Sequence, residues 1–144
     1  MTDEFINLIC AGNPRAQEFI GLWGQYLRAV DNLIDGDAHC NAENVLDCFA
    51  CGAAMYSHPF YQANKDSLQV VILVTTNTYA DSVKWEKAPE LWKRQWADVL
   101  RHADGNVMSA VTLICSGWPT LRSISAPFMA AAYIGHKDRH GVPA

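Results

Sequence analysis

The stretch Asn13-Pro-Arg-Ala-Gln-Glu-Phe-Ile-Gly-Leu-Trp-Gly-Gln-Tyr-Leu-Arg-Ala-Val-Asp-Asn-Leu-Ile-Asp-Gly36 decides the fold class of this chain. It opens with an asparagine that can cap a helix and a proline that fits its first turn. It ends at Gly36, a typical helix stop. Between these ends the apolar residues recur with a period near 3.6, at Phe19, Leu22, Trp23, Tyr26, Val30, Leu33 and Ile34. The stretch therefore predicts a long amphipathic helix over 13–36.

The rest of the chain gives the same kind of signal. Val70-Val-Ile-Leu-Val74 has strong strand propensity, but the apolar residues around it keep helical spacing. We expect helices over 4–10, 41–58, 67–87, 89–104 and 107–115, and two shorter ones that begin near Pro119 and Pro127. The sequence predicts an all-α fold, a compact antiparallel bundle of about six to eight helices joined by short loops.

Length and composition exclude several classes of protein. The 144 residues suit one domain, which we place at 1–136, followed by a polar C-terminal tail at 137–144. The net charge is −4 and lysine and arginine form no run, which makes nucleic acid a poor partner. The longest apolar run, 128–134, is far shorter than the ~20 residues of a membrane span. The acidic start lacks the basic region of a signal peptide, so we expect a cytoplasmic protein.

Asp31 and Asp35 lie one helical turn apart near the end of the first long helix. Two carboxylates on one helix face repel each other unless a cation or a basic group lies between them. They form either half of a binding site or a solvated helix exit at Asp35-Gly36.

Asn77 and Asp81 repeat this spacing in the 67–87 segment. They continue the apolar face of Val70, Leu73 and Val74, where a buried carboxylate would need a partner. If the two helices pack together, four oxygen-bearing side chains converge near one end. Oxygen ligands suit Mg²⁺, which is often shared with a substrate phosphate, and Arg28 and Lys84 lie close enough in sequence to meet a diphosphate.

Two motifs carry a resemblance to a known family. Arg28-Ala-Val-Asp31-Asn32-Leu-Ile-Asp35 resembles the first aspartate-rich motif of squalene and phytoene synthases, and Thr76-Asn77 followed by Asp81 is similar to their second motif. The resemblance implies an all-α, terpenoid-synthase-like fold that binds an isoprenoid diphosphate through Mg²⁺. It implies Asp31, Asp35 and Asp81 as metal ligands, with Asn77 in support. Asn32 stands where those enzymes carry an aspartate, and we group it with the ligand-binding residues.

Cysteine and histidine offer a competing site for zinc, because His39, Cys40, Cys48, Cys51 and His58 lie within a short segment. Cys48 and Cys51 fall inside a predicted helix, whereas structural zinc sites place paired cysteines on a tight turn. We therefore interpret the five cysteines of the chain as reduced, small core residues.

Trp92 and Trp96 lie one turn apart on one helix face, with Trp85 nearby. Packing in the core is the commoner use of such a pair, and a docking patch for a ligand, a partner or a second copy is the alternative. Two functions follow from the sequence. The first is Mg²⁺-dependent binding, with or without turnover, of a diphosphate-bearing small molecule. The second is a non-enzymatic helical interaction module, whose partner is another protein or a second copy of this chain.

Overall fold

The computed structural model describes the backbone of residues 3–36 and 40–140, and the side chains of these residues up to 130. Within these ranges every regular element is a helix, so the predicted all-α fold is confirmed. The chain divides into two compact units, and each is described by itself. We call Gly12–Lys65 the inserted unit, and Met1–Ala11 with Asp66–Ala144 the flanking unit. The assignment of 1–136 to one domain stays a prediction.

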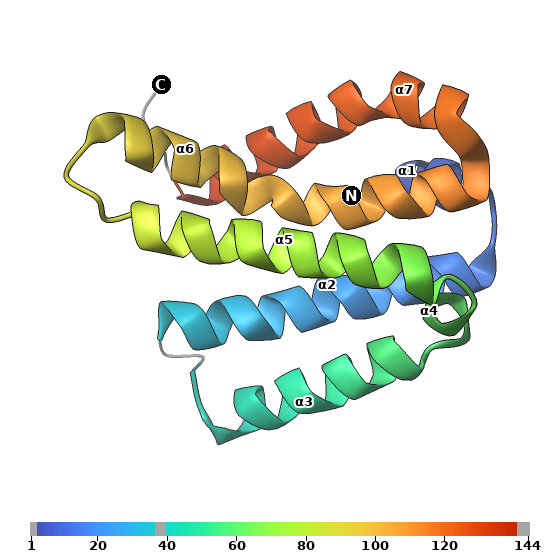
Figure 1. The fold of residues 1–144 in the computed structure, drawn as a ribbon, viewed down its shortest axis with the longest axis horizontal. Helices are drawn as coiled ribbons and strands as arrows, with labels where there is room; N and C mark the ends of the chain where they lie inside the picture. The colour runs from blue at the N-terminus through green and yellow to red at the C-terminus, as the bar shows by residue number, and fades with distance from the viewer. Residues whose placement is uncertain (1–2, 37–39, 141–144) are drawn as a thin grey trace. The chain divides into compact units, whose positions relative to one another are not determined.

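The inserted unit consists of α2 (Pro14–Asp35), α3 (Ala42–Ser57) and the short α4 (Pro59–Ala63). The Asn13 side chain accepts hydrogen bonds from the N–H groups of Arg15 and Ala16, at 3.0 and 3.3 Å, and Gly36 ends α2 with φ 60°. Both ends of the long helix predicted over 13–36 are therefore confirmed. Helices α2 and α3 run antiparallel and side by side, in blue and green in Figure 1.

Aromatic rings form the core of the inserted unit. Phe19 of α2 is fully buried, and its ring centroid lies 5.6 Å from that of Phe60 and 6.3 Å from that of Tyr61. Farther along, the bare backbone of Gly52 faces the ring of Tyr26, and a Cβ atom there would lie 3.2 Å from that ring. A glycine thus permits the close approach of α3 to α2.

The flanking unit contains α1 (Asp3–Cys10), α5 (Lys65–Trp85), α6 (Leu91–Arg101), the 3-10 turn η1 (His102–Asp104) and α7 (Gly105–His140). We predicted a turn at 104–106, but Gly105 has helical φ and ψ and the chain passes from α6 through η1 into α7. Helix α7 also continues past Pro127 to His140, so residues 137–140 of the predicted tail are helical. Residues 141–144 lie outside the described part.

One backbone break divides α7. Gly117 has φ 77° and ψ 176°, values that belong almost only to glycine, and Pro119 follows in the first turn after the break. Helix α1 packs against α7, where the rings of Phe5 and Phe128 lie 5.8 Å apart. Figure 1 shows α7 changing direction between its orange and red parts.

The buried face of helix α5 is not the face that carries Asn77 and Asp81. The buried side chains, which recur with helical spacing, are Leu68, Ile72, Thr75 and Ser82. Val70, Leu73 and Val74 are 60%, 61% and 57% exposed. The expectation that Asn77 and Asp81 extend a buried apolar face is therefore wrong.

Candidate functional site

The first aspartate pair lies at the end of α2, as predicted. Asp31 is half-buried, and Asp35 and Arg28 are exposed. Between the two aspartates, the Asn32 amide donates to the Oδ1 atom of Asn44 at 3.2 Å. This hydrogen bond directs Asn32 toward α3, whereas a ligand-binding role would require its amide to face the ligand.

Asn44 completes a link between α2 and α3. Its Nδ2 atom donates to the carbonyl oxygen of Ala29 at 3.0 Å, while its backbone N–H donates to the Asn41 side chain at the start of α3. The Asn44 carboxamide, on α3, therefore bonds two groups of α2, the Asn32 amide and the Ala29 carbonyl. The sequence shows the cap at Asn41, but nothing in the periodicity distinguishes Asn44 as the bridging residue.

The second polar pair is satisfied along its own helix. In α5 the Asn77 Nδ2 atom lies 3.4 Å from Asp81 Oδ2, and the Lys84 Nζ atom lies 3.5 Å from Asp81 Oδ1. The Asp81 side chain is 43% exposed and that of Lys84 is 72% exposed. Both carboxylate oxygens of Asp81 thus have neighbours one turn away, in the geometry of an ordinary solvated helix face.

The predicted magnesium site requires the two pairs to meet. Asp31 and Asp35 belong to the inserted unit, and Asn77 and Asp81 belong to the flanking unit, so their convergence stays a prediction. No cluster of three or more His, Cys, Asp or Glu side chains suited to a metal ion occurs among the described residues.

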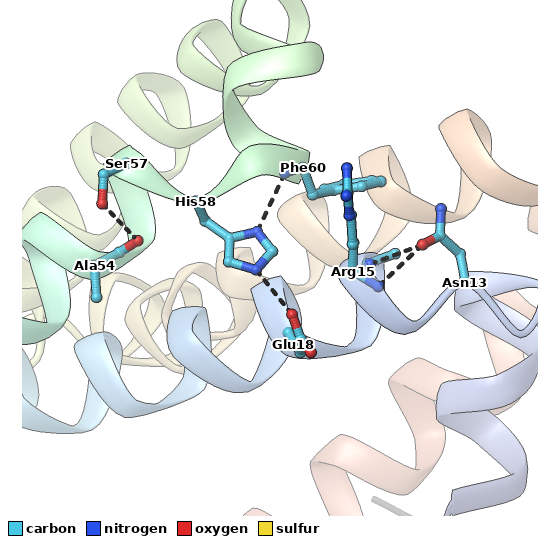
Figure 2. Close-up of polar contacts among 8 residues, drawn as sticks. Asn13, Arg15, Glu18, Ala54, Ser57, His58 and Phe60 are labelled. Atoms are coloured by element: carbon cyan, nitrogen blue, oxygen red, sulfur yellow. Dashed lines mark hydrogen bonds and ion pairs between the residues drawn. The ribbon is translucent and has the colours of Figure 1, made fainter.

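The residues considered for zinc have other surroundings. His39 lies outside the described residues, Cys40 is exposed, and Cys48 and Cys51 are half-buried. Figure 2 shows both ring nitrogens of His58 engaged. Nδ1 accepts from the N–H of Phe60 at 3.2 Å, and Nε2 lies 3.3 Å from Glu18 Oε2. His58 therefore caps α4 and connects it to α2.

An exposed apolar surface lies on α6. Trp92, Trp96 and Val99 follow one another at spacings of four and three residues and are 53%, 56% and 64% exposed. We call these three residues the α6 stripe; Leu91, 61% exposed, lies at its edge. The prediction that Trp92 and Trp96 pack in the core is wrong, because the buried residue of this helix is Ala97, more than 90° away around the helix axis.

The opposite side of α6 fastens it to α5. Arg101 forms an ion pair with Glu86 and lies over the ring of Tyr79, with its guanidinium carbon 5.8 Å from the ring centroid. At the start of the helix, the ring of Trp92 in the α6 stripe itself meets that of Trp85 edge to face at 5.7 Å. These contacts hold the helix on its far side and at one end, so the α6 stripe faces outward from a fixed position.

One half-buried acid just after α6 escaped the sequence analysis. Asp104, in η1, has a pKa that burial raises above its ordinary value, and the nearby His102 opposes this shift. A loss of hydration favours the neutral carboxyl group. The sequence predicts a polar turn at 104–106, and such a pattern gives no sign that the Asp104 carboxyl group is partly buried.

Comparison with known protein families, with curated proteins and with solved structures finds no match for this chain. In the part that the structure describes, none of the helices is both long and apolar enough to span a membrane.

Proposed function

We propose that this protein is a helical interaction module whose α6 stripe binds the α6 stripe of a second copy. The observation that carries the proposal is the exposure of Trp92 and Trp96 on a helix that Arg101 holds from the opposite face. Tryptophan contributes more to protein interfaces than almost any other residue.

The spacing of the α6 stripe favours a helix as its partner. Apolar side chains at i, i+4 and i+7 are the pattern by which one helix interlocks with another. A second α6 offers the same pattern, so two copies can pair through a two-fold axis with the same surface on both sides. Lys93 and Asp98, on the two flanks of the α6 stripe, have opposite charges, so in a parallel pair the Lys93 flank of one copy can face the Asp98 flank of the other.

The size of the surface sets the expected affinity. The α6 stripe with Leu91 presents roughly 400 Å² of apolar surface per copy, about half of what each partner contributes to an interface of standard size. Interfaces at this small end are transient. We therefore expect a dimer with a Kd on the order of 10 µM, which forms and separates readily.

Sedimentation velocity over a wide concentration range tests this proposal. The wild-type protein is expected to change from monomer to dimer as its concentration passes the Kd. Trp96→Ala removes one interface tryptophan from each copy, which should weaken the dimer by about 30-fold, the equivalent of about 2 kcal/mol.

Trp118→Ala is the matched control for Trp96→Ala. Trp118 is a tryptophan of similar exposure, 62%, but it lies on α7. This variant should dimerise as the wild type does. A wild-type protein that stays monomeric at every concentration, or a Trp118→Ala variant as impaired as Trp96→Ala, would contradict the proposal.

Mg²⁺-dependent binding of a diphosphate stays a separate prediction, supported by the two motifs. Calorimetric titration with Mg²⁺ and inorganic pyrophosphate should show binding by the wild type, and Asp31→Asn should weaken it at least tenfold. Asp98→Asn removes an exposed carboxylate from α6 and should bind like the wild type. The absence of any heat of binding with the wild type would end this hypothesis.

A further inference from the structure

Two cysteines lie at the contact between α1 and α7 in the flanking unit. Cys10 is the last residue of α1 and is completely buried, whereas Cys115 of α7 is half-buried. Cys115 follows the buried residues Met108, Val111 and Thr112 at helical spacing, so it lies on the same side of α7. The two thiols at this contact thus come from segments far apart in the sequence.

Hydrogen bonds fix the residues next to both cysteines. The Ser116 hydroxyl donates to the carbonyl oxygens of Leu8 at 3.0 Å and Ile9 at 3.3 Å. Residues 115–116 therefore lie against the last turn of α1, where the chain reaches Cys10.

The two thiols also interact electrostatically. Burial, and to a smaller extent the proximity of Cys115, raises the pKa of the Cys10 thiol to about 11. Burial also raises the pKa of Cys115. Because the thiolate is the reactive form, both groups persist as thiols at neutral pH and react slowly.

Each cysteine stands beside a backbone irregularity. Cys10 precedes Ala11 and Gly12, whose φ angles of 48° and 71° turn the chain out of α1. Cys115 lies two residues before the break at Gly117. A covalent bond between the two sulfur atoms would fix both of these points at once.

We propose that Cys10 and Cys115 form a reversible disulfide when the protein meets a low-molecular-weight disulfide. The more exposed Cys115 thiolate attacks one sulfur of the reagent, whose S–S bond breaks and releases one thiol. The Cys10 thiolate then attacks the Cys115 sulfur of this mixed disulfide and expels the second thiol. Two protein thiols are oxidised, and the reagent is reduced to two thiols.

The other cysteines are poorer candidates for such a bond. Cys40 is exposed and should form only a mixed disulfide with the reagent. Cys48 and Cys51 lie three residues apart on the same helix, where Cβ atoms are separated by about 5–6 Å, more than a disulfide accepts.

Peptide mapping of the full-length protein tests the proposal. The reduced protein is treated with oxidised glutathione, its remaining thiols are alkylated, and it is digested with trypsin. Cleavage after Arg15, Arg101 and Arg122 places Cys10 in peptide 1–15 and Cys115 in peptide 102–122, each with one cysteine. We expect these two peptides to be joined with the loss of two hydrogen atoms, and to separate again with dithiothreitol. The rate should rise nearly tenfold per pH unit between pH 7 and 9, because it follows the thiolate fraction.

Variants make the result decisive. Cys10→Ser should abolish the joined peptides and leave Cys115 as a mixed disulfide with glutathione. Cys40→Ser changes an exposed thiol and leaves the core intact, so the joined peptides should form as in the wild type. The proposal is overturned if Cys115 of the wild type reacts with glutathione while Cys10 remains a free thiol. It is also overturned if, once the exchange has reached equilibrium, the fraction of joined peptides is no higher in the folded protein than in concentrated urea.

Discussion

Replacement of Phe19 by alanine is expected to lower the free energy of unfolding of the inserted unit by about 3–5 kcal/mol. Phe19 is fully buried, and its ring lies between those of His58, Phe60 and Tyr61, with centroid distances from 5.6 to 6.3 Å. The substitution removes apolar contact area and leaves a cavity that these rigid rings cannot fill. Urea denaturation followed by circular dichroism measures the loss.

Phe49→Ala provides the control for the same chemical change at the surface. Phe49 lies on α3 of the same unit and is 75% exposed, so its truncation should change the free energy of unfolding by less than about 0.5 kcal/mol. Equal losses for the two variants would mean that the aromatic cluster around Phe19 is not the core of this unit.

Ile72→Ala in α5 should have the second largest effect, a loss of about 2–5 kcal/mol. Ile72 is 2% exposed, and the buried Thr75, one turn further on, reaches the carbonyl oxygen of Ala103 with its hydroxyl at 3.4 Å. The substitution leaves a cavity on the side of α5 that holds the helix in place. Thermal and urea unfolding both measure this loss.

Leu73→Ala changes the adjacent residue on the opposite face. Leu73 is 61% exposed, so the loss should stay below about 0.5 kcal/mol. The comparison tests which face of α5 is buried, and therefore whether Asn77 and Asp81 lie in water. A greater loss for Leu73→Ala than for Ile72→Ala would mean that the face carrying Asn77 and Asp81 is the buried one, as the sequence suggested.

Local signals predicted the helices well, because their causes lie within a few residues. Asn13, Pro14 and Gly36 set the ends of α2 by capping, proline geometry and a left-handed stop, and all three act as expected. Helix α7 was harder to predict. The predicted end of the 107–115 helix at Ser116-Gly117 is confirmed by the break at Gly117, but Pro127, which suggested a further helix start, lies inside α7.

The face of α5 could not be chosen from the sequence. Both sides of this helix carry apolar residues, so periodicity identifies a helix without saying which stripe is buried. The same limit applies to the candidate site. The spacing of Asp31 and Asp35 follows from one helix, but a shared metal site depends on how distant segments pack, which local patterns do not encode.

The conformation at Gly117 has a consequence for how this chain can change over time. Its φ of 77° and ψ of 176° suit an amino acid that lacks handedness, and every chiral replacement would be strained there, even though no neighbouring atom would obstruct a Cβ. Selection at this position therefore acts on the absence of a side chain.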